Sequence, residues 1–402
     1  MVKVAVLGYG VVGSGVVHVL DKNSNRISFN AGQEISVKYI YDIREFQNCP
    51  YINLFSNSFE TILNDPEIAV VIEVIGGVDA ALDYTQRCLK AGKSVVTSNK
   101  ELIAEHGSDL LKLAMDTGVN YLFEASVGGG IPVIRPISQC MTANIINEIY
   151  GVLNGTTNYI LTDMERNGAD FSDALRDAQK KGYAEADPTA DIEGQDTCRK
   201  ICILSSLAFG RHIYPRQVPT EGISGVTKAD MKYAAELGYE IKLLGRARLA
   251  DDRISVYVAP HLVSKHHLLA VVSGVTNGVV VRGNAVGDVV FCGAGAGKLP
   301  TASAVVADVI DAVKHLHARK WISWSAGSDD LVSDPSLLES AWYIRTDATR
   351  GKVEKEFGNV LFAEGKSKET CFQTGVMSGK MKDELLARGI VAHTQFRILG
   401  DY

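Results

Sequence analysis

Three glycines near the amino terminus limit the fold more than any other feature of the sequence. Gly8, Gly10 and Gly13 follow the apolar run 2–7 and precede a helix-like apolar pattern at 15–20. The order is therefore strand, glycine turn and helix. The glycines permit a tight turn, close approach of the backbone to a pyrophosphate, and close packing of the helix on the strand. The first turn of the helix offers free N–H groups to the phosphates. We therefore expect a dinucleotide-binding domain rather than a plain glycine turn.

Strand-like and helix-like segments alternate through the first 143 residues. Strands are expected at 35–41, 69–75 and 94–97, and a helix at 80–91. This alternation predicts a parallel, doubly wound (Rossmann) sheet whose ligands lie at the carboxyl ends of its strands. The fold class expected for the chain is α/β.

The pattern changes near Asn144. Helices are expected at 159–167, 172–181 and 197–209, and strands at 240–249, 254–258 and 274–282, which together predict an α+β domain. We expect the following division of the chain: a nucleotide-binding domain at 1–143 plus 295–320, a catalytic and dimerisation domain at 144–294, a linker at 321–340 and a small domain at 341–402. The small domain has the order β-α-β-β-α-β of a ferredoxin-like unit.

Composition narrows the range of partners. The chain is 46% hydrophobic and 22% charged with a net charge of -6, which is ordinary globular usage without a basic surface for nucleic acid. No run reaches the roughly 18 apolar residues of a membrane helix. The seven cysteines form no C-x-x-C, and the nine histidines complete no zinc spacing. We expect a cytoplasmic protein without nucleic-acid or membrane partners and without structural zinc.

Two residues at the end of the second strand give opposite indications about the dinucleotide. Asp42 is placed to accept a hydrogen bond from a ribose 2′-hydroxyl, as in NAD sites, whereas Arg44 is placed to bind the 2′-phosphate of NADP. The choice between NAD and NADP stays open. A second glycine run, 293–297, is either a tight helix entry or a close backbone approach to the cofactor.

A lysine and several acids give the chain its candidate chemistry. Asp196 and Lys200 lie four residues apart on one helix face, after an acidic loop at 182–191. The pair is either a surface ion pair or, given its apolar neighbours, a partly buried functional pair. A lysine of this kind can move a proton while hydride passes to or from a nicotinamide, and nearby carboxylates suit a substrate with an ammonium group. Lys100 is a second cation in the expected crevice.

At this point the chain resembles the homoserine dehydrogenase family across most of its length. The resemblance is carried by the runs 6–15, 92–100, 124–132 and 153–161 and by the family signature at 178–200. It implies reversible, NAD(P)-dependent interconversion of L-homoserine and L-aspartate 4-semialdehyde, on the route from aspartate to threonine and methionine. The partner is then a small-molecule substrate.

The resemblance and the residue pattern together give a set of site residues. The resemblance implies as catalytic residues Lys200, as proton donor and acceptor, with Asp196 and Lys100. It implies as substrate-binding residues Thr156, Tyr183, Glu185, Asp191 and Asp196. The cofactor-binding residues are Gly8, Gly10, Val11, Val12, Gly13, Asp42, Arg44, Thr97, Ser98, Asn99, Lys100, Gly182, Gly295 and Gly297.

The resemblance also implies an alkali cation, sodium, near the hinge between the domains. Its ligands would be the Glu124 side chain and the backbone oxygens of Val127, Gly129 and Ile131. A hard cation prefers oxygen ligands, and a glycine-rich loop can supply them. From the residues alone, Glu124 is equally a loop anchor.

The small domain at 341–402 resembles a degenerate regulatory ACT-type domain. The turn expected after its first strand is replaced by Asp347–Gly351, so the domain either binds an amino-acid effector or serves only oligomer contacts. We expect a homodimer built through the middle domain, with a tetramer as the alternative. Two other functions are alternatives: a nucleotide sensor without catalysis, which would have lost Lys200 or Asp196, and an oxidoreductase acting on an amino-acid imine, which the segment 182–200 disfavours.

Overall fold

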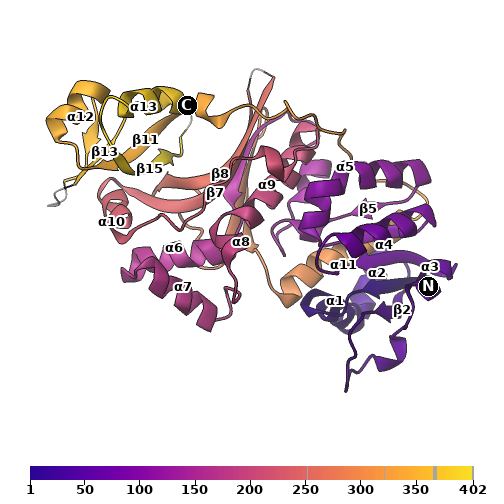
Figure 1. Cartoon of the computed structure of the whole chain (residues 1–402). Coiled ribbons are helices and arrows are strands. Elements are labelled where there is room, and N and C mark those ends of the chain that lie inside the picture. Colours follow the sequence, from indigo (N-terminus) through magenta and orange to yellow (C-terminus); the bar gives the residue numbers. More distant parts are fainter. Residues whose placement is uncertain (251, 321, 365–368, 401–402) are drawn as a thin grey trace. The chain divides into compact units, whose positions relative to one another are not determined.

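The computed structural model describes residues 1–250, 252–320, 322–364 and 369–400 (Figure 1). The chain forms two compact units. The first unit comprises Met1–Ile145, Cys202–Pro215 and Gly293–Ser328, and the second comprises Ile146–Ile201, Arg216–Cys292 and Asp329–Tyr402. One residue of the expected linker (321) and parts of the expected small domain (365–368 and 401–402) lie outside the described residues.

The first unit is built on a parallel sheet with the order β2-β1-β3-β4-β5. The strands are β1 (Val2–Leu7), β2 (Ile35–Tyr41), β3 (Ile68–Glu73), β4 (Ser94–Thr97) and β5 (Tyr121–Leu122). Their runs of buried Val, Ile and Leu are typical of parallel strands covered on both faces. The expected doubly wound α/β sheet is confirmed. Its strand order reverses between β1 and β3, which is where such sheets bind ligands.

Helices cover this sheet in the manner that right-handed crossovers require. The helices of the first unit are α1 (Val11–Lys22), α2 (Ser24–Ala31), α3 (Phe59–Asn64), α4 (Asp79–Lys90), α5 (Lys100–Thr117) and α11 (Lys298–Lys314), with short turns η1 (Ile52–Leu54), η2 (Glu124–Ser126) and η3 (Pro136–Cys140). The connections through α1 and through α4 and α5 run in opposite directions along the sheet, so they lie on opposite faces. α1 packs against α11, and α4 packs against α5.

The second unit contains a long mixed sheet with the order β10-β9-β6-β7-β8-β15-β11-β13-β12. Its strands are β6 (Ile146–Val152), β7 (Tyr239–Ala250), β8 (Arg253–Ser264), β9 (Thr276–Gly283), β10 (Gly287–Ala294), β11 (Glu339–Thr346), β12 (Leu361–Phe362), β13 (Thr370–Gln373), β14 (Met377–Ser378) and β15 (Ala392–Ile398), where β14 pairs with β11. The strand β6 stands at the centre of the α+β region and was not among the strands expected from the sequence. β6 ends two residues before Asn154, which directly precedes α6.

Capping residues determine where the helices of the second unit begin. These helices are α6 (Gly155–Asn167), α7 (Phe171–Lys180), α8 (Thr189–Ile192), α10 (Lys228–Glu236), α12 (Arg350–Phe357) and α13 (Gly379–Leu386), with η4 (Pro215–Gln217) and η5 (Pro335–Leu337), and α9 (Gln195–Phe209) has residues in both units. Asn154 caps α6, and Thr227 forms a capping box with Asp230 at α10. Among the described helices of the chain, none is long and apolar enough to cross a membrane.

The C-terminal segment continues the sheet of the second unit. Its strands β15, β11, β13 and β12 are neighbours in that order and antiparallel, which is the strand order of a ferredoxin-like unit, and its core includes Trp342, Phe372 and Leu385. β15 joins β8 in parallel through Arg397 and Ile398. The segment expected as a linker is hydrogen-bonded along its course, for example from the Ser333 N–H to the carbonyl of Ile254.

Candidate active site

The glycine-rich turn of the first unit borders a cavity of about 400 Å³. Gly8 has a φ of +96°, and a Cβ on Gly13 would lie 1.9 Å from the carbonyl oxygen of Gly8, so only glycine is tolerated at either position. α1 begins at Val11, one residue before Val12, and its first N–H groups are available to an anion. The other residues that line the cavity include Gly10, Asp42, Arg44, Val74, Ile75, Gly76 and Tyr84.

The two residues expected to select the dinucleotide are bonded to each other. The Arg44 guanidinium donates from Nε and Nη2 to the Asp42 carboxylate at 2.9 and 2.8 Å, and the N–H of Tyr9 donates to the same carboxylate at 2.6 Å. These contacts, led by those of Arg44, hold the pKa of Asp42 at about 2 against the effect of burial. The Asp42 carboxylate is therefore ionised and bonded to Arg44. This geometry does not decide between NAD and NADP as the cofactor.

The residues expected beside the nicotinamide lie at the end of β4 and directly after it. Thr97 and Asn99 are buried, and Ser98 and Lys100 are half-buried. The Asn99 side chain accepts a hydrogen bond from the N–H of Leu102 and so caps α5, whose first residue is Lys100.

The Thr97 hydroxyl donates to the carboxylate of Glu73 at 2.6 Å. Sequence reasoning assigned no role to Glu73. Its only sequence signal was an acid at the end of an otherwise apolar strand.

In the second unit, Lys200 and Asp196 form a buried pair. Lys200 Nζ donates to Asp196 Oδ2 at 2.7 Å and to the carbonyl oxygen of Leu153 at 2.8 Å, and only 8% of Lys200 and 4% of Asp196 is exposed. The surface alternative raised from the sequence is wrong for this pair. These bonds use two of the three protons of an ammonium group and direct the amine from two sides.

Asn154 joins this pair to a second acid. Its side-chain N–H₂ group donates to Asp191 Oδ1 at 2.7 Å and to Asp196 Oδ2 at 2.8 Å. The buried Asn277 donates to the same Leu153 carbonyl that Lys200 uses, at 2.8 Å. Neither asparagine was assigned a role from the sequence; α6 begins four residues before the helix expected at 159–167, so the capping position of Asn154 was not recognised.

The other residues expected to bind substrate lie on the segments before and after these acids. Thr156 is buried and its hydroxyl donates to the carbonyl of Tyr183 at 2.7 Å. The Tyr183 ring is 44% exposed and contacts the ring of Tyr159. Glu185 is exposed, and Gly182 has a φ of +74° with open space around it. The structure thus brings Lys200 and Asp196 into direct contact, connects Asp191 to them through Asn154, and brings Thr156 and Tyr183 together.

The expected cation loop of the first unit is anchored through Glu124. The Glu124 carboxylate accepts backbone N–H groups from Val133, Ile134 and Arg135 at 2.6 to 2.8 Å. It therefore does serve as a loop anchor, while Oε2, which accepts only the Arg135 N–H, keeps further acceptor capacity. The buried Asp308 accepts the Glu124 N–H at 2.7 Å, and burial together with the Glu124 charge raises the pKa of Asp308 to about 7. Asp308 is paired with the Arg135 guanidinium at 2.5 Å, so the acidic oxygen suited to a hard cation is that of Glu124.

The backbone of the same loop packs against the second glycine run. A Cβ on Gly129 would lie 2.5 Å from the carbonyl oxygen of Gly295, so the two segments meet backbone to backbone. Val127 and Ile131 are buried beside them. Gly297, with a φ of +121°, is the residue before α11. The second glycine run therefore has a packing role, whether or not it also approaches the cofactor.

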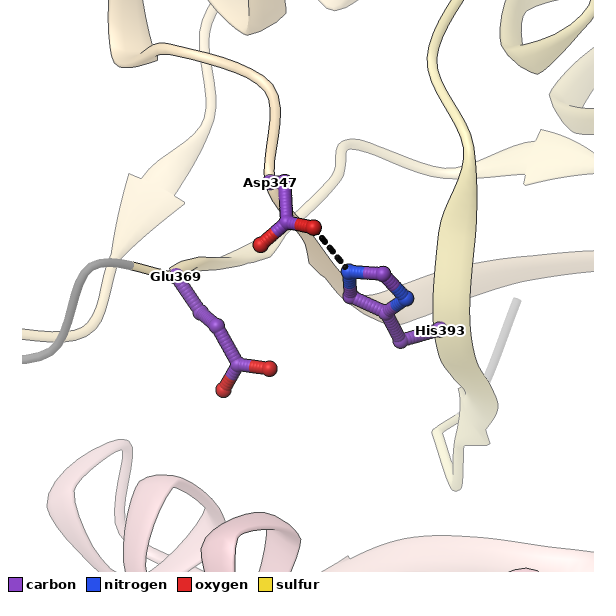
Figure 2. A group of neighbouring side chains, drawn as sticks. All are labelled: Asp347, Glu369 and His393. Atoms are coloured by element: carbon purple, nitrogen blue, oxygen red, sulfur yellow. Dashed lines mark ion pairs between the residues drawn. The ribbon is translucent and has the colours of Figure 1, made fainter.

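A second group of metal-ligating side chains lies on the C-terminal segment. Figure 2 shows that Asp347 and His393 face each other, 2.8 Å apart between Oδ2 and Nε2, with Glu369 beside them. Spacing in the sequence gave no sign of this group, because its members come from three separate segments. The Glu369 carboxylate is already paired with Arg345 at 2.8 Å, and the Asp347 side chain is 74% exposed. We assign no metal to it.

Comparison with protein families gives two matches. A family model described as homoserine dehydrogenase matches residues 132–310. A second model, described as the NAD-binding domain of homoserine dehydrogenase, matches residues 8–124. The first match contains the buried Lys200 and Asp196 pair, and the second contains the glycine-rich turn.

Individual proteins agree with these matches. A homoserine dehydrogenase of Pseudomonas aeruginosa is 40% identical over an alignment that covers 98% of this chain and 92% of that protein. The crystal structure of a homoserine dehydrogenase from Thiobacillus denitrificans has a TM-score of 0.88 at 36% identity and covers 99% of this chain and 98% of its own. A hyperthermophilic archaeal homoserine dehydrogenase, solved in complex with NADPH, has a TM-score of 0.66 at 27% identity over 77% of this chain and 97% of its own.

Proposed function

This chain belongs to the homoserine dehydrogenase family of NAD(P)-dependent oxidoreductases that act on a CH–OH group, and from that premise we propose that Lys200 is the proton donor and acceptor of the reaction. The reaction interconverts L-homoserine and L-aspartate 4-semialdehyde. The observation that carries the proposal is the buried amine of Lys200, held at 2.7 Å from Asp196 and at 2.8 Å from the Leu153 carbonyl oxygen.

The proton and the hydride leave the alcohol by separate routes. When bound, the nicotinamide ring supplies the hydride acceptor in one direction and the hydride donor in the other. In oxidation, the neutral amine of Lys200 takes the hydroxyl proton as the carbonyl forms. In reduction, the Lys200 ammonium returns a proton to the aldehyde oxygen, using the N–H that Asp196 and Leu153 do not engage. Asp196 holds the amine in place through both directions.

The acids around Lys200 suit the other end of an amino-acid substrate. Asp191, which shares the Asn154 side chain with Asp196, is our candidate for the substrate ammonium group together with Glu185. Thr156 and Tyr183 are proposed to shape the same site, and Lys100 to lie near the reacting oxygen. A substrate with an ammonium group and a hydroxyl group matches this distribution of charge.

The cofactor and cation proposals rest on the first unit. Gly8, Gly10 and Gly13 are proposed to receive the pyrophosphate, Asp42 and Arg44 the adenosine ribose, and residues 97–99 the nicotinamide side. For sodium, the remaining acceptor capacity of the Glu124 carboxylate supports the proposed ligands Glu124, Val127, Gly129 and Ile131.

Other expectations stay predictions. These are the domain boundaries, a homodimer formed through the α+β region, a cytoplasmic location and the ACT-type character of the C-terminal segment. The ferredoxin-like strand order of that segment supports the last of these. Effector binding by it is a separate proposal that the strand order alone does not carry.

The experiment that tests the function is homoserine oxidation with NAD and with NADP, using wild-type protein and Lys200→Ala. We expect turnover in the variant to fall at least about 100-fold, as for loss of a positioned proton-transfer group, with cofactor affinity nearly unchanged. Lys232→Ala, which removes an exposed lysine of α10, is the matched control. Turnover of Lys200→Ala close to that of wild type would remove the mechanism, and an inactive wild-type protein would favour the nucleotide-sensor alternative.

A further inference from the structure

Glu73 is a buried carboxylate that the proposed reaction does not use. It is the last residue of β3, beside the point where the strand order reverses, and none of its surface is exposed. Burial of a carboxylate is costly unless hydrogen bonds compensate it, and an apolar strand does not require one for packing. The role of Glu73 therefore depends on which groups donate hydrogen bonds to its two carboxylate oxygens.

One oxygen holds the loop that follows β3. Glu73 Oε1 accepts the backbone N–H of Ile75 at 2.7 Å. Residues 74–76 of this loop line the dinucleotide cavity, and the carbonyl oxygen of Val74 lies 2.8 Å from the position that a Cβ on Gly8 would occupy. A shift of Ile75 would therefore move the cavity wall next to the glycine-rich turn.

The other oxygen holds the loop that follows β4. Glu73 and Thr97 are register partners on parallel strands, and the Thr97 hydroxyl donates to Glu73 Oε2 at 2.6 Å. The same hydroxyl oxygen accepts the N–H of Asn99 at 2.9 Å. The Asn99 side chain then donates to the carbonyls of Ile75 and Gly77, at 3.3 and 2.6 Å. Glu73 thus connects both loops in one hydrogen-bonded network.

We propose that Glu73 is a positioning residue for the cofactor, which holds loops 74–77 and 97–99 where they receive the nicotinamide half of the dinucleotide. It acts through Thr97 and Asn99 and does not touch the cofactor. This inference rests on the proposed function, because it takes 97–99 as the nicotinamide side.

A carboxylate suits this role better than a neutral side chain. An ionised carboxylate accepts from both loops and has no donor that would compete with theirs. Burial raises the pKa of Glu73 to about 7, while the hydrogen bonds from Thr97 and Ile75 oppose that rise. The two loops therefore favour the ionised form that binds them both.

The test compares Glu73→Ala with Glu73→Gln. Alanine removes both hydrogen bonds, whereas glutamine keeps an acceptor for Ile75 and offers an N–H to the Thr97 oxygen. We expect Glu73→Ala to raise the cofactor KM and Kd at least about tenfold with kcat within about threefold of wild type, and Glu73→Gln, which loses only the acceptor for Thr97, to raise KM and Kd by a smaller factor with kcat unchanged. The matched control is Glu67→Gln, which alters a 63% exposed carboxylate next to the other end of β3 and is expected to behave as wild type.

Thr97→Val gives the same readout if Glu73→Ala does not fold, because it removes the hydroxyl and keeps the side-chain shape. An unchanged Kd for NADPH in the folded variant, measured by cofactor fluorescence, overturns the proposal. So does a loss of kcat at unchanged cofactor affinity, since a positioning role for the cofactor loops would act on binding. A wild-type protein that binds NADPH but fails to oxidise homoserine would instead refute the proposed function, so the two failures are distinguishable.

Discussion

Replacement of Asn154 tests whether Asp191 and Asp196, the two acids of the candidate active site, need a shared hydrogen-bond donor. Its N–H₂ group bridges Asp191 and Asp196, and its oxygen accepts the N–H of Thr157 at 2.9 Å to cap α6. Asn154→Ala removes the bridge and the cap. Asn154→Ser keeps an oxygen that can cap the helix but is too short to bridge two carboxylates. The two variants therefore separate the chemistry of the site from the stability of the helix.

The expected magnitude follows from the bonds that are lost. A hydrogen bond to a charged group contributes about 1.5 to 3 kcal/mol net. Asp196 also receives Lys200 at 2.7 Å, so its displacement moves the proposed catalytic amine. Loss of about 2 to 3 kcal/mol in the transition state corresponds to about a 30- to 150-fold fall in kcat/KM for homoserine. Loss of the cap costs about 1 kcal/mol of folding stability in the alanine variant only.

The assay is the formation of reduced cofactor from homoserine, combined with denaturant unfolding of each variant. Both variants should lose kcat/KM to a similar extent, while Asn154→Ser should unfold close to wild type and Asn154→Ala at lower denaturant. Activity of Asn154→Ser within about threefold of wild type would refute the reasoning, because the shared donor would then contribute less than a single hydrogen bond. Cofactor affinity serves as the internal control and should not change.

Two further predictions follow from the charges described above. Arg44→Ala should lower the ratio of kcat/KM with NADP to that with NAD at least about tenfold, because it removes the cation that we propose binds the 2′-phosphate and leaves Asp42 to a ribose hydroxyl; equal losses with both cofactors would contradict this. His261 is fully buried, and burial followed by the Arg246 charge lowers its pKa to about 3, below the value of about 6.5 in the unfolded chain. The unfolded state therefore takes up a proton first as pH falls below about 6.5, and stability is lost, by about 2 kcal/mol at pH 5. Denaturant unfolding at pH 6.5 and at pH 5 should show a smaller loss of folding stability in His261→Gln than in the wild-type protein. Equal losses in the two proteins would contradict this explanation.

Local patterns in the sequence predicted the first unit well. The run 2–7 folds as β1, and Gly8 and Gly13 occupy positions where a side chain would clash. These features depend on residues that are close in the chain, so periodicity and turn chemistry are sufficient to find them. The Lys200 and Asp196 pair could be predicted from the sequence for the same reason, because the two residues lie one helical turn apart.

The strand β6 was missed because a buried charge interrupts its apolar pattern. Glu148 stands within that strand and is buried against Arg246 of β7, at 2.6 Å between Oε1 and Nε. The partner that neutralises the acid is distant in the sequence, so the segment reads as polar. The roles of Glu73 and Asn154 were out of reach for a related reason: each depends on which strands and loops become neighbours, such as the pairing of Glu73 with Thr97. One sequence does not specify that pairing.

The junction between β8 and β15 has a consequence for any shortened form of the chain. β8 is a long, largely buried strand, and β15 pairs with it at His261 and Leu262, where Arg397 lies opposite His261. A chain ending before residue 339 would expose unpaired backbone groups of β8 to other molecules, and such a bare strand recruits further strands into aggregates. Strand β15 thus covers this part of β8, and truncations that remove it should be judged first by whether the product stays monodisperse.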